Sequence, residues 1–233
     1  MRPEVGVPVA GRRPDAVVFD CDGTIADTES ISDQAWTETL ATHGYQATQD
    51  DFRQVVGHPF AQNWAYFAPR AGLDDRQAFR TRLRARFIEL FEQGLVVHED
   101  AATTIRELAT AGVPVAVASS STHRHVERVL ERAELTGLVG AIVGADDVTA
   151  HKPHPEPYLA AARDLGVDPV RCAAVEDTPV GVRAAVAAGM YTVAVVRSHG
   201  DAADLQEAHH IVDEVSVASV FPVREHWQRE ERA

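Results

Sequence analysis

The chain has few of the features that mark secreted or membrane proteins. It contains only two cysteines, Cys21 and Cys172, and both fall in segments expected to be buried strands, so we interpret them as small apolar core residues. No apolar run reaches the roughly 18 residues that a membrane-spanning helix needs. Residues 1–14 contain Pro and Gly and lack the continuous apolar segment of a secretory signal, which indicates a flexible tail. We therefore expect a cytoplasmic protein.

Basic residues are also scarce. Lys and Arg together number 22 against 35 Asp and Glu, and the net charge is −13. This balance excludes nucleic acid and anionic membranes as expected partners. A small anionic substrate remains compatible, because a bound divalent cation inverts the local field of a carboxylate site. We expect a monomer or a weak dimer.

The most informative segment is VVFDCDGT, residues 17–24. Its apolar residues do not alternate with polar ones, which is typical of a strand buried on both faces of a parallel sheet. Asp20 and Asp22 then lie at the carboxyl end of this strand, where open α/β sheets bind ligands. A calcium-binding EF-hand loop is excluded, because its required Gly and Glu positions hold Ile25 and Ile31.

Polar side chains follow two later apolar runs and a lysine lies between them. The run at 115–118 ends in Ser119 and Ser120, and the run at 173–175 ends in Glu176 and Asp177, with Lys152 before the second run. Four successive strand ends are thus expected to carry, in order, paired aspartates, serine, lysine and a second acidic pair.

From residue 100 onward, helical and strand patterns alternate. We expect helices at 101–111, 122–135, 157–165 and 180–188, and strands at 113–119, 141–143, 172–176 and 191–196. Glycines at the left-handed positions that end helices follow at Gly112, Gly137, Gly166 and Gly189. Repeated strand–helix units with short loops predict an α/β fold with a doubly wound parallel sheet.

The interval between the first two strands shows only helical patterns. Ser30 and Asp33 are expected to cap a first helix, Thr48 and Asp51 a second, and a third is expected to end before Pro69. A longer helix carries apolar residues every four positions: Phe79, Leu83, Phe87 and Phe91. We interpret these aromatic stripes as the packing of a small inserted helical bundle. The predicted domains are an α/β core of residues 15–29 and 97–222 and a helical cap of residues 30–96, and residues 223–233 are expected to form a frayed terminal helix.

Four segments together resemble the motifs of the haloacid dehalogenase (HAD) superfamily of phosphohydrolases. They are FDCDGTIADTES, VAVASSS, HKPHPEPYLAA and VEDTPVGVRAAVAAGM, in that order. The resemblance covers roughly residues 15 to 200. It is to the group with a helical cap after the first motif, which includes β-phosphoglucomutase-like and phosphoglycolate phosphatase-like enzymes. A Rossmann-like core with an inserted cap is implied.

The resemblance also implies residue roles. Asp20 would be the nucleophile and a metal ligand, and Asp22 would offer a backbone carbonyl to the metal and act as acid and base. Glu176 and Asp177 complete an all-oxygen shell of the kind that Mg²⁺ prefers. The expected phosphate-binding residues are Gly23, Thr24, Ser119, Ser120 and Lys152. For Ser119, a helix N-cap is the alternative role.

Two linkers and one loop of the cap complete the resemblance. Asp27 and Thr28 are where the chain would leave the core, and residues 96–99 would return, forming a two-stranded hinge. The family usually carries Pro-Gly near the end of this linker, whereas the chain has Glu99-Asp100. His58 and Phe60 lie in a cap loop that reads the substrate in this family, and an ordinary exposed loop histidine is the alternative for His58.

The predicted function is a Mg²⁺-dependent phosphatase that acts on a small phosphorylated metabolite, a sugar or polyol phosphate, through an aspartyl-phosphate intermediate. A β-phosphoglucomutase is less favoured, because family mutases use a hinge histidine and a cap arginine where the chain has Ser32 and Phe60. A 2-haloacid dehalogenase lacks the second acid, so Asp22 argues against it. A catalytically silent binding protein on the same fold is the alternative from another class.

Overall fold

The structure is a computed structural model that describes residues 13–55, 60–197 and 200–221. The chain divides into two compact units, one made of the residues up to Ala26 and from Val97 onward, and the other of residues 27–96. From the sequence, we predicted that the chain first passes from the core to the cap between residues 29 and 30, three residues later than in the structure. The predicted terminal helix at 223–233, and the predicted tail apart from Arg13 and Pro14, lie outside the described residues.

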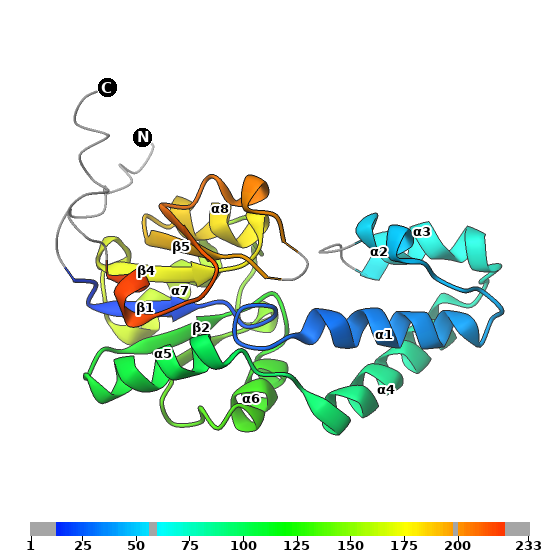
Figure 1. Ribbon diagram of the computed structural model, residues 1–233, viewed down its shortest axis with the longest axis horizontal. Helices are drawn as coiled ribbons and strands as arrows, with labels where there is room; N and C mark the ends of the chain where they lie inside the picture. The colour runs from blue at the N-terminus through cyan, green and yellow to red at the C-terminus, as the bar shows by residue number, and fades with distance from the viewer. Residues whose placement is uncertain (1–12, 56–59, 198–199, 222–233) are drawn as a thin grey trace. The chain divides into compact units, whose positions relative to one another are not determined.

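The first unit is built on a sheet in which every described strand pair is parallel (Figure 1). Its strands are β1 (Ala16–Phe19), β2 (Val115–Ala118), β3 (Ala141–Val143), β4 (Cys172–Glu176), β5 (Tyr191–Val195) and β6 (His210–Val212), in the order β3-β2-β1-β4-β5-β6. The chain leaves β1 toward β2 on one side and later returns to β4 on the other. The carboxyl end of β1 is therefore the topological switch point of the sheet.

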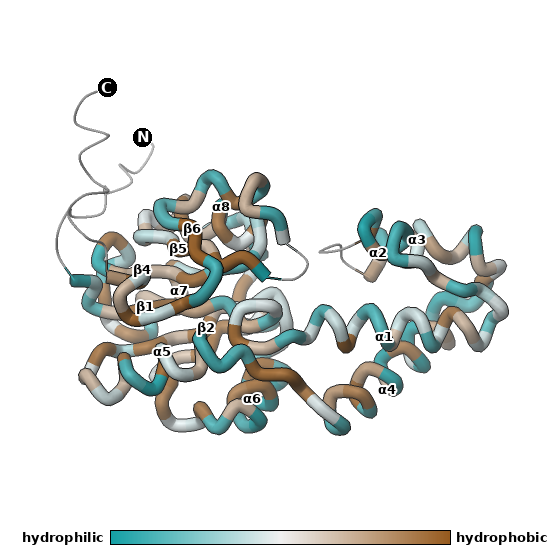
Figure 2. The backbone as a smooth tube through the Cα atoms, in the orientation of Figure 1, coloured by the Kyte–Doolittle hydropathy of each residue, from teal (hydrophilic) through white to brown (hydrophobic). Residues whose placement is uncertain are grey.

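Helices cover both faces of this sheet, as a doubly wound fold requires. They are α5 (Glu99–Thr110), α6 (His123–Arg132), α7 (Glu156–Leu165), α8 (Pro179–Ala187) and the short α9 (Val217–Val220). Alternate strand residues such as Val18 and Ala116 pack with α7 and α8, and the strands are the most apolar part of the unit (Figure 2). The predicted fold class is confirmed.

One predicted helix end is wrong. Helix α6 ends at Arg132, and Glu134, three residues before Gly137, takes the left-handed backbone conformation that closes the helix, with φ 57°. Leu135 N donates to Leu130 O (2.9 Å) and Glu134 N to Glu131 O (3.2 Å), the two bonds of a Schellman motif. Leu135 is fully buried, so its packing closes the helix early even though a non-glycine residue must adopt positive φ.

Strand β6 was not predicted at all. Its three residues, His210–Val212, pair with β5 in parallel register. Its apolar run is only Ile211 and Val212, between His210 and Asp213, and this is too short to predict a strand. The predicted strands at 141–143 and 172–176 coincide with β3 and β4.

The second unit consists, in its described part, of helices α1 (Thr28–Ala41), α2 (Gln49–Arg53), α3 (Phe60–Ala71) and α4 (Arg76–Gly94). Asp27, not Ser30 or Asp33, caps α1, because its side chain accepts from Ser30 N at 3.0 Å. The capping box of α2, formed by Thr48 and Asp51, is as predicted. Helix α3 continues through Pro69 and ends two residues later, so the expected end before Pro69 is wrong.

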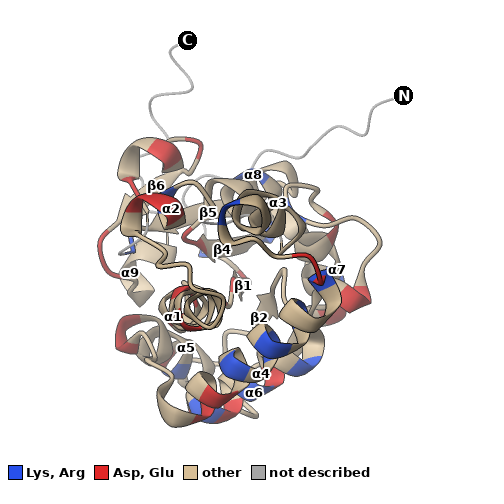
Figure 3. Cartoon of the chain, turned by 90° about the vertical axis from the view of Figure 1, so that its right-hand side faces the viewer, with Lys and Arg blue, Asp and Glu red and all other residues tan. Residues whose placement is uncertain are grey.

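Aromatic residues form the core of this helical unit. The Trp36 ring lies 5.8, 5.2 and 5.3 Å from those of Phe60, Phe67 and Phe79, measured between centroids. Figure 3 shows basic residues along α4, and Arg76 and Arg80 of this helix lie over the Phe60 ring. Arg80 lies 5.4 Å from the Phe60 ring centroid, and Arg86 pairs with Glu38 and Glu89. The aromatic stripes therefore pack the unit, as predicted.

The two linkers run antiparallel where the chain passes between the units. Asp27 N donates to Val96 O at 2.9 Å, and His98 N donates to Ile25 O at 2.9 Å. Among the described residues, no helix has both the length and the apolar content to cross a membrane.

Candidate active site

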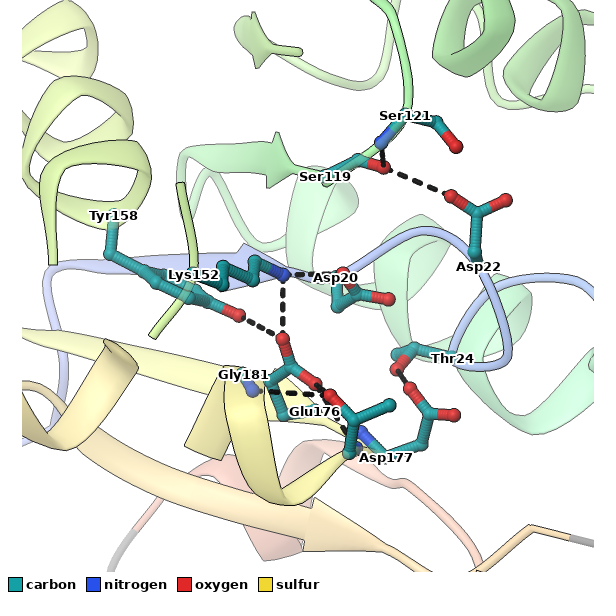
Figure 4. A network of polar contacts seen from close by, with 11 residues as sticks. Asp20, Asp22, Thr24, Ser119, Ser121, Lys152, Tyr158, Glu176, Asp177 and Gly181 are labelled. Atoms are coloured by element: carbon teal, nitrogen blue, oxygen red, sulfur yellow. Dashed lines mark hydrogen bonds and ion pairs between the residues drawn. The ribbon is translucent and has the colours of Figure 1, made fainter. Parts of the chain in front are cut away.

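The predicted residues of three neighbouring strand ends meet at the switch point of the sheet (Figure 4). Asp20 follows β1, Ser119 follows β2, and Glu176 ends β4. Asp20 N donates to Val175 O at 2.9 Å, which continues the β1–β4 pairing up to the first carboxylate. The parallel register thus delivers all three side chains to one edge.

Lys152 is the only lysine in the chain, and its side chain is buried at this edge of the sheet. Its Nζ lies 2.5 Å from Asp20 Oδ1 and 2.6 Å from Glu176 Oε1, and 4.9 Å from the centre of the Tyr158 ring. Only 3% of its side chain is exposed. Burial lowers the pKa of Lys152, but the two carboxylates outweigh burial and raise it well above its ordinary value. The ammonium group is therefore a fixed positive charge.

Glu176 is fully buried and accepts five hydrogen bonds. Lys152 Nζ and Tyr158 Oη (2.7 Å) donate to Oε1, and Asp177 N, Thr178 N and Thr178 Oγ1 donate to Oε2 at 3.1, 3.2 and 3.0 Å. A carboxylate offers about four lone-pair positions, so this group is saturated by protein donors. These hydrogen bonds allow Glu176 to hold Lys152 and the backbone of Asp177 in place.

Asp177 lies over the tight turn that follows β1. Thr24 Oγ1 donates to Asp177 Oδ1 at 2.9 Å, and both residues are buried. Gly23 has φ +86°, and a Cβ atom on it would lie 2.1 Å from Asp177 Oδ2. Gly23 is therefore required for two reasons, its backbone conformation and the close approach of the carboxylate.

Asp22 contacts different partners from Asp20. Its Oδ2 accepts from Ser119 Oγ at 3.0 Å, and its Oδ1 lies 2.9 Å from His125 Nε2. Ser119 Oγ itself accepts from Ser121 N at 2.9 Å, which directs the hydroxyl hydrogen toward Asp22. Burial lowers the pKa of His125, but the hydrogen bond to Asp22 and the negative charge of Asp22 together outweigh burial and raise it.

The donor set fits a divalent cation of the Mg²⁺ type. Asp20, Glu176 and Asp177 have buried carboxylate oxygens within 4.8 Å of one another, although those of Glu176 already accept from protein donors. Burial raises the pKa of Asp20 well above its ordinary value; Lys152 opposes this, and the neighbouring carboxylates add to it. Three carboxylates around one lysine leave excess negative charge, which an oxygen-preferring cation would offset.

Some predicted residues lie outside the buried cluster. Ser120 is exposed beside Ser119, and Phe60 opens α3 and packs against Trp36 in the helical unit. His58 lies outside the described residues. The two cysteines are free and buried, and burial raises the pKa of both thiols, that of Cys172 to about 12, as befits inert core residues.

Three contributors to this site were missed by the sequence reasoning. Tyr158 and Thr178 hold Glu176, and His125 contacts Asp22. Tyr158 and Thr178 fall inside the quoted motifs and carry side chains able to donate hydrogen bonds, which is the signal that was available. His125 lies on the first turn of the helix after Ser119, where its spacing alone gave no sign of a contact.

A further network ties the turn after β1 to later parts of the chain. Arg197 Nη2 donates to Thr24 O at 3.1 Å and to Asp100 Oδ1 at 3.0 Å. Asp100 Oδ2 in turn accepts from Val215 N at 2.8 Å. Burial raises the pKa of Asp100, but the hydrogen bond from Arg197 and that from Val215 outweigh burial and lower it. Asp100 thus anchors Arg197.

This fold and this site define a hydrolase of the α/β class with a helical insertion. A family model described as a haloacid dehalogenase-like hydrolase matches residues 14–189. The chain belongs to this family, and the predicted membership and enzyme class are confirmed.

Named relatives are similar along most of the chain. Fructose-1-phosphate phosphatase YqaB of Escherichia coli is 31% identical over 184 residues, which cover 77% of the chain and 95% of that protein. Protein SUPPRESSOR OF QUENCHING 1 of Arabidopsis thaliana, a chloroplastic protein, is 33% identical over 188 residues. That match covers 77% of the chain but only 18% of the much longer plant protein.

Solved structures share the fold. A HAD family hydrolase from Deinococcus radiodurans, determined with bound phosphate and sodium, has 33% sequence identity and a TM-score of 0.73, covering 88% of the chain and 92% of that structure. The β-phosphoglucomutase-like structure from Thermotoga maritima has 26% identity and a TM-score of 0.76, covering 94% and 99%.

Proposed function

We propose that the protein is a Mg²⁺-dependent phosphatase that hydrolyses a small phosphorylated metabolite through an aspartyl-phosphate on Asp20. The observation that carries this proposal is the buried ammonium of Lys152, 2.5 Å from Asp20 and 2.6 Å from Glu176. The proposed nucleophile thus lies beside a fixed positive charge at the carboxyl end of the central strand. Such a pair suits attack on an anionic phosphate ester.

The reaction has two steps. In the first, an Asp20 oxygen attacks phosphorus, the bond from phosphorus to the leaving oxygen breaks, and protonated Asp22 gives its proton to that oxygen. In the second, a water oxygen attacks phosphorus, Asp22 takes a proton from the water, and the bond from phosphorus to Asp20 breaks. Inorganic phosphate is released, and both carboxyl groups return to their starting states.

Asp20 and Asp177, with the backbone carbonyl of Asp22, would hold Mg²⁺. When bound, the cation neutralises charge on the phosphoryl oxygens. Glu176 supports this arrangement by orienting Lys152 and the Asp177 backbone. We assign phosphate binding to the turn at Gly23 and to four side chains: Thr24, Ser119, Ser120 and Lys152.

The proposed substrates are sugar or polyol phosphates. The name of the E. coli relative, a fructose-1-phosphate phosphatase, and the phosphate in the Deinococcus structure support this class. The specificity roles of His58 and Phe60, the cap function of the helical unit, the cytoplasmic location, and the monomeric or weakly dimeric state stay predictions.

Turnover of p-nitrophenyl phosphate tests the proposal. Purified protein should release p-nitrophenol only with Mg²⁺, and excess chelator should stop it. Asp20→Asn should abolish release, and Asp22→Asn should slow it by about 10²–10⁴-fold, the usual worth of general acid–base catalysis. Near-normal turnover by the Asp20 variant would rule out the covalent route. No turnover by the wild type would favour the silent binding protein.

β-Glucose 1-phosphate distinguishes the phosphatase from the mutase. Ser32 and Phe60 replace the histidine and arginine that family mutases use, so this substrate, if accepted, should yield free phosphate. Glucose 6-phosphate as the main product would instead establish the phosphomutase. A screen of phosphorylated sugars and polyols then identifies the preferred substrate.

A further inference from the structure

His125 reaches the site from a helix, whereas the predicted residues come from strand ends and loops. It lies in the first turn of α6, and its Nε2 is 2.9 Å from Asp22 Oδ1. Its side chain is 18% exposed, so the ring is largely enclosed by protein. A ring nitrogen at this distance from a carboxylate forms a hydrogen bond that fixes both partners.

Asp22 is held from two sides. Ser119 Oγ donates to Oδ2 at 3.0 Å from the start of the β2–α6 connection, and His125 Nε2 lies 2.9 Å from Oδ1 in the first turn of α6. Two hydrogen-bond partners on opposite oxygens restrain rotation about the bond that orients the carboxyl plane. One partner alone would restrain this rotation less, since terminal carboxyl torsions are broad.

We propose that His125 is a positioning residue that sets the orientation of Asp22 for proton transfer to the leaving oxygen. This inference rests on the proposed phosphatase function. During the first step, the proton of Asp22 moves to the leaving oxygen as the bond from that oxygen to phosphorus breaks, while His125 keeps its own proton. If the carboxyl group is misaligned, the reaction slows. It slows more when the leaving oxygen depends more strongly on receiving that proton.

The dependence on the leaving group gives a test that separates positioning from general damage. Phenol is a poorer leaving group than p-nitrophenol, although the two aryl phosphates have similar shapes. His125→Leu should lower kcat/KM for phenyl phosphate by about 10-fold to 100-fold, a fraction of the full general-acid effect. The loss for p-nitrophenyl phosphate should be several times smaller. His125→Gln, whose amide can still donate, should restore most of the activity toward phenyl phosphate.

A double-mutant cycle provides the second readout. If His125 acts through Asp22, adding His125→Leu to Asp22→Asn should cause little further loss, because the group being oriented no longer transfers a proton. His123→Gln is the matched control, since His123 lies on the same helix but pairs with Asp147 at 2.7 Å. That variant should leave both substrates unaffected.

The outcomes are distinguishable. Equal losses for the two aryl phosphates, or full additivity with Asp22→Asn, overturn the positioning role while leaving the phosphatase intact. Absence of wild-type turnover overturns both proposals. If His125→Leu does not fold, as judged by its melting curve, the same comparison with His125→Ala decides, because Ala adds no bulk.

Discussion

Asp177 Oδ2 occupies the position that a side chain at Gly23 would need. A Cβ atom on residue 23 would lie 2.1 Å from this oxygen, well inside the closest real contacts of such an atom. The glycine of the first motif and the aspartate of the last are thus packed directly against each other. The Asp177 carboxylate can therefore occupy this position only because residue 23 is glycine.

Gly23→Ala should therefore weaken Mg²⁺ binding. The methyl group must displace the Asp177 carboxylate, and we expect at least a tenfold loss of affinity, equivalent to about 1.4 kcal/mol. Isothermal titration with Mg²⁺ measures it. Gly112→Ala is the control, since Gly112 also has positive φ (+71°) but has no atom within 4 Å of its added Cβ. Equal affinities for the two variants would contradict the prediction.

Replacing Lys152 should destabilise the fold as well as the site. Lys152→Met leaves Asp20 and Glu176 buried without their positive partner, and breaking a buried ion pair in this way costs about 3–5 kcal/mol. Urea unfolding monitored by circular dichroism measures the loss. A change below about 1 kcal/mol would show that the two carboxylates find other compensation.

The charge of Lys152 can also be observed directly. Because it is the only lysine, protein grown with ¹⁵N-lysine has a single side-chain nitrogen resonance to follow. Asp20 and Glu176 hold the pKa of Lys152 well above its ordinary value of 10.5, so the resonance should remain that of an ammonium group beyond this pH. Titration at or below the ordinary value would contradict the ion pairs.

Tyr158→Phe isolates one hydrogen bond. The change removes the hydroxyl that donates to Glu176 at 2.7 Å but keeps the ring under Lys152. A hydrogen bond to a charged group contributes about 1.5–3 kcal/mol, and four other donors to Glu176 remain. We expect a loss in unfolding free energy near the lower end of that range. An unchanged urea midpoint would mean that another donor replaces the hydroxyl.

The helical unit should show an acid-dependent stability traceable to Asp51. Burial raises the pKa of Asp51, but hydrogen bonds from Thr48, Tyr66 and Tyr45 outweigh it and lower the pKa from 3.8 to about 2. The ionised form is thus favoured in the folded state. Its stabilisation is present above pH 3.8 and is lost as pH falls from there toward 2.

Melting curves of Asp51→Asn test this linkage. Between pH 5 and pH 3, the wild type should lose more melting temperature than the variant, followed by tryptophan fluorescence because Trp36 lies in the core of this unit. Parallel losses in the two proteins would assign the acid sensitivity to other carboxylates.

The sequence predicted the strand ends well because their chemistry is local. Asp20, Ser119 and Glu176 each follow an apolar run, and the parallel order of the sheet brings such ends together. Tertiary packing decided what the sequence did not reveal. Leu135 closes α6 early by burying its side chain, a preference that no glycine pattern records.

The contact of His125 with Asp22 could not be predicted from the sequence either. It depends on how far α6 lies from the turn after β1, which the pattern of apolar residues does not specify. The capping of α1 by Asp27 instead of Ser30 shows the same limit at short range, since several nearby residues have capping side chains and the backbone selects one.

The hydrogen bonds of Arg197 indicate how far along the chain the unit built on the sheet extends. The family match stops at residue 189, yet β5, β6 and the contacts of Arg197 with Thr24 and Asp100 all come after it. A fragment cut at residue 189 would lose the outer strands of the sheet and leave the turn after β1 without its guanidinium support. The smallest piece that keeps these contacts must extend past Val215, whose backbone N–H closes the network through Asp100.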